Sequence, residues 1–167
     1  MCGRKQAAYL GGYKKEVGAS PTVATDSVIV TSVIEVNEER DGATLDLPGA
    51  YLHAENDEHI TMLLKGKLAE LLLQVDPSLY RKYVITNSKG EPMLYVKLAK
   101  ALYGLLKSAL LFYKKLRGEL EDMMFEVNPY DPCVANGTQM TVCWHINDLN
   151  IGHKDPMEVS KFIIAMG

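Results

Sequence analysis

The segment MTVCWHINDLNIGH, residues 140–153, decides the fold of this chain. Apolar residues occupy alternate positions over residues 140–146, which is the period of a β-strand. Asn147 and Asp148 then predict a tight turn, after which residues 149–152 return as an antiparallel strand. The segment therefore reads as a β-hairpin with Asp148 at its tip.

The residues upstream of this hairpin add another strand and a helix. Residues 133–136 predict a short strand, and Gly137 and Thr138 turn the chain into the hairpin. Apolar residues recur every three or four positions over residues 105–124, the period of an amphipathic helix. They are Leu106, Leu110, Tyr113, Leu116, Leu120 and Met123 or Met124. A final helix is expected over residues 156–166.

A long helix is expected near the N-terminal end. Ser20 suits the N-cap of a helix and Pro21 its first position, because proline lacks the N–H that this position leaves unpaired. Asp41 and Gly42 suit its end. The caps and the spacing between them predict a helix of about twenty residues.

The middle of the chain predicts shorter elements. Residues 43–47 form a strand that carries Asp46 near its tip. Residues 67–75 suit a short helix, and residues 81–86 and 92–96 alternate like two strands of a hairpin.

The expected order is helix, strand, helix, hairpin, helix, strand, strand, which lacks the regular alternation of a doubly wound sheet. We predict an α+β fold, an antiparallel sheet with helices packed on one face. The chain has 167 residues and contains no repeat, low-complexity stretch or linker, so we expect a single domain over residues 1–167.

The composition is that of a folded protein, with 47% hydrophobic and 23% charged residues. No window approaches a membrane-spanning length of apolar residues and no secretion signal precedes the fold, so we expect no membrane partner. Cys2, Cys133 and Cys143 form no Cys-x-x-Cys pair, and the four histidines show no helical zinc spacing. We expect a reducing compartment and an intracellular, cytoplasmic location.

Charge is segregated along the chain, although the formal net charge is only −3. Residues 26–58 carry nine acids and one base, whereas residues 97–117 carry six bases and no acid. Each run is compatible with a solvated helix face. The two runs also leave open a phosphate-binding surface beside an acidic, metal-binding one.

Asp46 and Asp148 are the candidate catalytic pair. Carboxylates at adjacent strand ends can hold Mg²⁺ ions for in-line nucleotidyl transfer. Either aspartate alone is more often a turn or capping residue. The pair therefore depends on the two strands being neighbours.

Four blocks of sequence support that pairing. They are SPTVATDSVIVTSVIEVNEERDGATLDLPGAYLHAENDE (residues 20–58), KLAKALYGLLKSALLFYKKL (97–116), NPYDPCVAN (128–136) and VCWHINDLNIGH (142–153). In this order and at these distances they resemble the reverse transcriptase of copia-type retrotransposons, over about residues 4–164 of this chain. The resemblance implies the fingers and palm of an RNA-directed DNA polymerase that takes an RNA template, a DNA primer and deoxynucleotides.

The resemblance also implies roles for single residues. Asp46 falls on the family's first catalytic aspartate and, with Asp148, would hold Mg²⁺ or Mn²⁺. Tyr51 falls on the aromatic beneath the sugar of the incoming nucleotide, where its ring would exclude a ribose 2′-hydroxyl. Without the motif, Tyr51 would be read as a core residue.

The resemblance implies roles for basic and loop residues as well. Tyr103 and Gly104 match the family's Leu-Tyr-Gly block at the template and nucleotide site, where Lys107 could meet a phosphate. Arg4 and Lys5 match a basic segment that resembles a triphosphate clamp.

The third block departs from the family, which has Asp-Asp where this chain has Asn147 and Asp148. A neutral amide holds Mg²⁺ far less well than a carboxylate, so the site has two carboxylates in place of three. The chain also ends about twenty residues later, and we expect it to lack the thumb and the ribonuclease H domain. The sequence predicts a degenerate reverse transcriptase that is inactive as this fragment.

Two other functions stay open. A non-catalytic module could bind RNA or an RNA–DNA hybrid through the basic residues 97–117. A structural fragment could self-associate through an apolar surface that a missing thumb leaves exposed.

Overall fold

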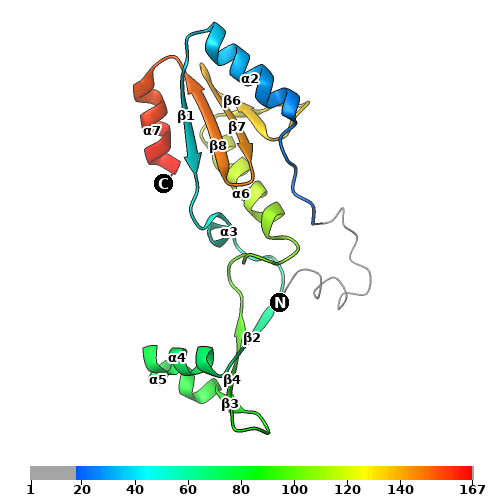
Figure 1. Ribbon diagram of the computed structural model, residues 1–167, viewed down its shortest axis with the longest axis vertical. Coiled ribbons are helices and arrows are strands. Elements are labelled where there is room, and N and C mark those ends of the chain that lie inside the picture. The colour runs from blue at the N-terminus through cyan, green and yellow to red at the C-terminus, as the bar shows by residue number, and fades with distance from the viewer. Residues whose placement is uncertain (1–17, 167) are drawn as a thin grey trace.

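The structure is a computed structural model, and it describes residues 18–166. Antiparallel sheets and helices make it an α+β fold, as predicted. Figure 1 shows two parts, a larger one built on a five-stranded sheet and a smaller one, with three strands, that projects from it.

The predicted hairpin lies at the centre of the five-stranded sheet, whose strand order is β1-β8-β7-β6-β5. Strands β7 (Met140–His145) and β8 (Asp148–His153) pair antiparallel. Strand β1 (Asp41–Asp46) lies along the outer side of β8. Strands β6 (Val134–Asn136) and β5 (Glu126–Val127) continue the sheet beyond β7. Two strands about a hundred residues apart in sequence therefore meet at β1 and β8.

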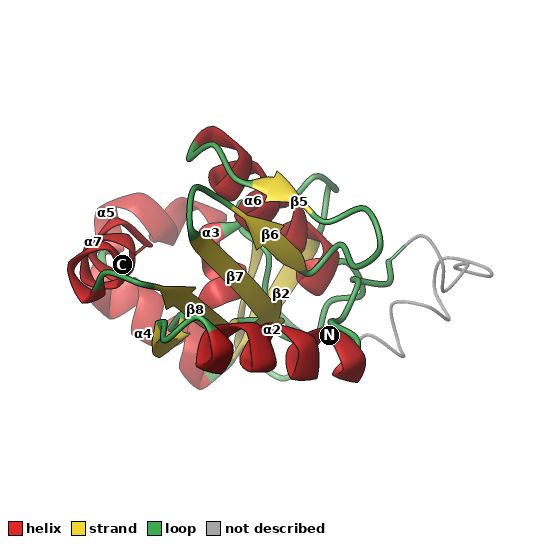
Figure 2. Ribbon diagram, turned by 90° about the horizontal axis from the view of Figure 1, so that it is seen from above, coloured by secondary structure: helices red, strands yellow, loops and turns green. Residues whose placement is uncertain are grey.

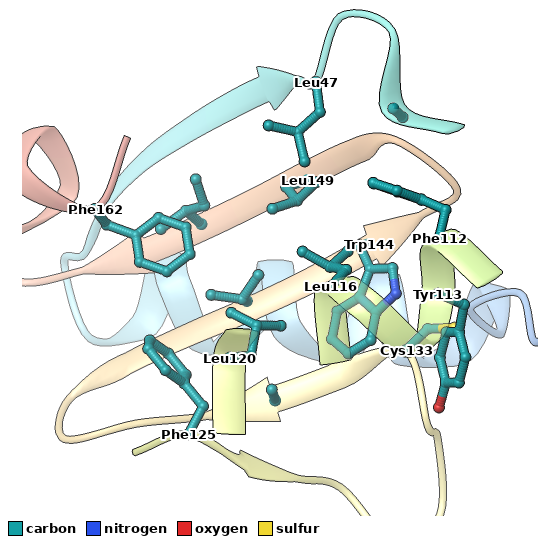
Figure 3. Packing of buried hydrophobic residues seen from close by; sticks show 14 of the residues in the cluster. Leu47, Phe112, Tyr113, Leu116, Leu120, Phe125, Cys133, Trp144, Leu149 and Phe162 are labelled. Carbon is teal, nitrogen blue, oxygen red and sulfur yellow. The ribbon is translucent and has the colours of Figure 1, made fainter. Parts of the chain in front are cut away.

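One face of this sheet and two helices form the hydrophobic core. Helix α6 (Ser108–Asp122) supplies the middle of the predicted apolar stripe, and α7 (Pro156–Met166) lies at the predicted residues. Figure 3 shows these side chains interleaved with those of β7 and β8. The buried members include Phe112, Leu116, Leu120, Val142, Trp144, Leu149, Ile151 and Phe162. The end of the stripe was wrongly predicted, because α6 stops at Asp122 and leaves Met124 exposed at a positive φ of 66°.

The other face of the sheet is covered as well, so the prediction of helices on one face is wrong. Helix α2 (Thr25–Asn37) lies across the side opposite α6, as Figure 2 shows. Side chains alternate between the faces of a strand, so Asn150 points away from the core that holds Leu149 and Ile151. Its amide donates to the Glu35 carboxylate of α2 at 3.1 Å.

Helix α2 begins later than its sequence signals suggest. Ser20 does not cap it, and the first helical residue is Thr25. The backbone N–H of Ala24 instead donates to the Asp131 carboxylate, at 2.9 Å. A side chain that is remote in sequence therefore takes the place of a local N-cap. The helix also ends at Asn37, four residues before Asp41.

The smaller sheet has the strand order β2-β4-β3. Strand β4 (Pro92–Lys97) and β3 (Ile85–Thr86) form the second predicted hairpin. Its first arm is shorter than predicted, because Arg81–Tyr83 form a single 3₁₀ turn. Strand β2 (Thr61–Lys65), which the sequence did not indicate, pairs over its full length with residues 93–97 of β4.

A helix covers one face of the smaller sheet. Helix α4 (Lys67–Val75) was predicted, and it buries Ala69 against the side of the sheet that carries Leu94. Helix α5 (Pro77–Tyr80) follows directly, and the Asp76 carboxylate caps it by accepting from the backbone N–H of Leu79 at 2.9 Å.

Candidate functional site

Asp46 and Asp148 lie directly opposite each other where β1 ends and β8 begins. The backbone N–H of Leu47 donates to the Asn147 carbonyl at 3.0 Å. That bond makes the two aspartates a non-hydrogen-bonded pair, the kind in which antiparallel strands bring side chains closest. Both carboxylates are exposed on the face that carries α2. The strand pairing on which this candidate pair depends is therefore present in the structure.

The turn that carries Asn147 lies one residue earlier than predicted. Ile146 and Asn147 form it, and Asp148 is already the first residue of β8. Ile146 has a φ of 59°, a left-handed conformation that a β-branched side chain adopts only under strain. Strain of this kind is held in place by its surroundings and is concentrated at functional sites.

Asn147 reaches back across the turn to Asp46. Its Nδ2 donates a hydrogen bond to Asp46 Oδ1. Like charges directly opposite on two strands repel each other, and this amide donor offsets part of the charge on Asp46. Asn147, which precedes Asp148 in the turn, is thus a direct partner of Asp46.

A hollow of about 370 Å³ lies beside the two carboxylates, between the sheet and α2. Its lining includes Val28 of α2, Thr44 of β1 and His145 of β7, along with the aspartates. Thr44 and Val28 were not predicted as site residues. Side chains alternate between the two faces of β1, so Thr44 shares a face with Asp46 and could have been predicted. Nothing in the sequence placed α2 over this face.

Asp46 and Asp148 are the residues that could hold a divalent cation, with hard carboxylate oxygens from adjacent strands. Nowhere in residues 18–166 do three or more His, Cys, Asp or Glu side chains converge as a metal-binding group. The donor set therefore fits a cation held by two carboxylates and provides no third negative charge.

Tyr51 and Tyr103 lie side by side. Tyr51 belongs to α3 (Ala50–His53), and its ring centroid is 4.4 Å from that of Tyr103 and 6.2 Å from that of Phe112. Burial, followed by the neighbouring Tyr103 hydroxyl, raises the pKa of Tyr51 above its usual value. Gly104 follows at a φ of 90°, which glycine adopts without strain. The Tyr51 ring thus packs on the edge of the core and is half-buried.

Lys107 is held by carboxylates of the acidic run. Its Nζ lies 2.6 Å from Glu58 and 3.7 Å from Asp57, and its side chain is 21% exposed. A lysine in this position is largely neutralised before any phosphate arrives. The acidic and basic runs of the sequence are therefore partners here.

Other bases of residues 97–117 are paired too. Lys100 lies 3.2 Å from Glu55, Lys115 pairs with Glu119, and Arg117 lies 2.8 Å from Glu121. Lys97 and Lys114 form no ion pair within the part of the chain that the structure describes.

Arg4 and Lys5 lie outside the described residues. None of the helices described between residues 18 and 166 is long and apolar enough to cross a membrane.

Helix α2 exposes an apolar surface. Val30, Val33 and Val36 are 55%, 61% and 80% exposed, and Thr31 is its one buried residue among those described. Apolar patches of this kind are uncommon on isolated monomers.

Comparison with protein-family models, with curated proteins and with solved structures gives no match to this chain.

Proposed function

We propose that this chain is the fingers and palm of a copia-type reverse transcriptase whose nucleotidyl transfer is crippled at Asn147. The observation that carries the proposal is the placement of Asp46 directly opposite Asp148 on neighbouring strands, with Asn147 bonded to Asp46. The resemblance requires two catalytic blocks, about a hundred residues apart, to meet at one sheet edge.

Asp46 and Asp148 would hold Mg²⁺ or Mn²⁺ in this function. When bound, the ion would stabilise the negative charge on a transferring phosphoryl group. Asn147 offers only an amide, which adds no charge to the ion and supplies a donor to Asp46. Weak ion binding is therefore the expected defect.

Tyr51 would act by its bulk. A ring fixed against Tyr103 and Phe112 has a defined position, and a fixed ring can exclude a 2′-hydroxyl from the sugar beside it. The template, the primer and deoxynucleotides are the partners that this function needs.

Primer extension on an RNA template tests the proposal. We expect no product with Mg²⁺ from the full chain, because electrostatic stabilisation by the site is incomplete. Mn²⁺ should be tried beside Mg²⁺, with Asp46→Ala as the matched variant. If the parent extends the primer above a no-enzyme control and Asp46→Ala abolishes this extension, then Asn147 does not cripple the site.

The alternative function, nucleic-acid binding through residues 97–117, gains no support from the side chains there. Four of the six bases in that segment lie in ion pairs with carboxylates of the same chain. Self-association stays a prediction, to be measured by size-exclusion chromatography.

A further inference from the structure

Helix α2 turns its polar side toward the sheet. Ser27, Thr31 and Glu35 are spaced four residues apart, so they share one side of the helix. Thr31 is buried, and the Glu35 carboxylate accepts the hydrogen bond from Asn150 of β8. Figure 2 shows this helix along one face of the sheet, with its opposite side turned away from the strands. A surface helix of a globular protein usually has the reverse arrangement, with its apolar side toward the core.

The side of α2 that faces away from the sheet is apolar. Six branched aliphatic residues of this helix are exposed, namely Val28, Ile29, Val30, Val33, Ile34 and Val36. A groove of about 560 Å³ runs along this side, and the described residues that line it all belong to α2. No other helix or strand described between residues 18 and 166 lines that groove.

Little on this side of α2 opposes its removal from water. From Ile29 to Asn37 the one charged residue in the sequence is Glu35, which faces the sheet. Ser32 lines the groove, and its hydroxyl donates to the Val28 carbonyl at 2.9 Å. Because that hydrogen bond lies within the helix, a partner can cover Ser32 without leaving its hydroxyl unpaired. The surface that fits this side is therefore itself apolar and uncharged.

The exposed area of this side suits a contact between two copies of the chain. The six exposed aliphatic residues present on the order of 500 Å² of apolar surface. Two copies that pack these surfaces together would remove on the order of 1,000 Å² from water, which is about the least that a stable, specific interface needs. In a two-fold dimer each copy supplies the same patch, so an uncharged apolar surface meets another of the same kind.

We propose that the outward side of α2 is the interface of a two-fold symmetric homodimer. Val33 lies at the centre of this side, between Ile29 and Val36, and packs near Val33 of the second copy. The proposal assigns the self-association that the sequence left open to a defined surface. It uses neither Asp46 nor Asp148, so it does not rest on the function proposed for them.

Sedimentation velocity of the full chain, from low to high micromolar concentration, tests the proposal. The parent should be a dimer that dissociates on dilution. Val33→Glu should weaken dimerisation by roughly 100-fold or more, because two-fold symmetry brings two like charges together in an apolar interface. Val33→Lys should do the same. An equal mixture of the two variants should recover dimers, because opposite charges then meet.

Val75→Glu is the matched control. Val75 is 78% exposed, but it lies at the end of α4, and Figure 1 shows that helix at the end of the molecule far from α2. The control should leave dimerisation unchanged. The melting temperature of the parent should rise with protein concentration, because association stabilises the folded state by mass action, whereas that of Val33→Glu should not.

Three results would overturn the proposal. They are a parent that stays monomeric at every concentration, a dimer that Val33→Glu leaves intact, and a mixture of Val33→Glu and Val33→Lys that does not recover dimers. A monomeric parent would leave this side of α2 to a different, apolar protein partner. A dimer that is insensitive to Val33→Glu would place the interface elsewhere on the chain.

Discussion

Asn147 donates the amide hydrogen of its side chain to the Asp46 carboxylate, across the turn that joins β7 to β8. The two residues are 101 positions apart in the sequence, and strand pairing alone brings them together. An aspartate at position 147 would have no hydrogen to donate at neutral pH, and its charge would face Asp46.

Asn147→Asp should therefore lower the melting temperature in EDTA, because a third carboxylate joins Asp46 and Asp148 without a counter-charge. Millimolar Mn²⁺ or Mg²⁺ should then raise the melting temperature of the variant more than that of the parent. An ion that binds only the folded state stabilises it by mass action. Differential scanning fluorimetry with and without the ion measures both effects.

The control is Asn37→Asp, the same substitution at the exposed C-terminal end of α2, which should show no specific response to metal. If Mn²⁺ shifts parent and Asn147→Asp equally, then Asp46 and position 147 do not share a cation site. In that case Asp46 and Asp148 would be structural residues of the turn and not ligands of a cation.

Tyr51→Ala should lower the free energy of unfolding by about 1–2 kcal/mol, because a half-buried ring loses its contacts with Tyr103 and Phe112. Tyr51→Phe should be close to neutral, since the Tyr51 hydroxyl makes no hydrogen bond within the described chain. Urea unfolding measures both. A loss near the 3–5 kcal/mol typical of a fully buried aromatic would make Tyr51 a core residue and weaken its assignment as a nucleotide gate.

Local patterns predicted those elements whose signal lies within the segment itself. The hairpin of β7 and β8, the middle of α6 and all of α4 follow from periodicity. The start of α2 does not, because Ser20 and Pro21 carry the local signature while the helix begins where Asp131 binds Ala24. A tertiary contact decided that boundary.

The polarity of the residues in the main sheet did not show that helices cover both of its faces. Thr141 and Cys143 alternate with the core residues of β7 and lie on the opposite face, where Cys143 is buried beneath α2. Strand β2 escaped prediction because Met62, Leu63 and Leu64 form an unbroken apolar run, which has neither the strand nor the helix period.

The sequence indicated which two aspartates would be neighbours, but it did not indicate which side chains pair with the predicted site residues. The resemblance chose Asp46 and Asp148, and the register confirms that they are neighbours. Lys107 was assigned to a phosphate, but spacing along a chain cannot reveal that Glu58 lies 2.6 Å away.

Cys133 and Cys143 should be protected from thiol reagents in the folded protein. Both thiols are free and buried. Burial, with the negative charge of Asp131, raises the pKa of Cys133 to about 12 and that of Cys143 to about 11. The thiolate is the reactive form, so labelling of a Cys2→Ser variant should proceed only at the rate of unfolding. Fast labelling of both thiols at neutral pH would contradict their burial.

The same thiols predict how stability changes in alkali. In the unfolded chain the thiols have their usual pKa of 9.0, whereas in the folded chain the pKa is about 12 for Cys133 and about 11 for Cys143. Above pH 9 the unfolded state therefore binds fewer protons than the folded state, and stability falls as pH rises toward 12. A Cys133→Ala, Cys143→Ala variant should lose part of that slope in melting temperature.

Asp131→Asn should destabilise the protein by about 1–3 kcal/mol, because Asp131 is 6% exposed and accepts from the backbone N–H groups of Ala24 and Cys133, each at 2.9 Å. Burial opposes its ionisation, but hydrogen bonds from Ser27, Ala24 and Cys133 outweigh it and hold the pKa of Asp131 below the usual value. The ionised form thus contributes stability above the unfolded pKa of 3.8, and this contribution is lost as pH falls through the lower folded pKa.

Acid unfolding of the parent and of Asp131→Asn tests the direction of this pH dependence. The parent should lose more stability than Asp131→Asn between about pH 5 and pH 2, so that the two curves converge in acid. Asp26→Asn, at an exposed position in the first turn of α2, is the control and should track the parent. Parallel acid curves for parent and Asp131→Asn would mean that the carboxylate is not the group that fixes the start of α2.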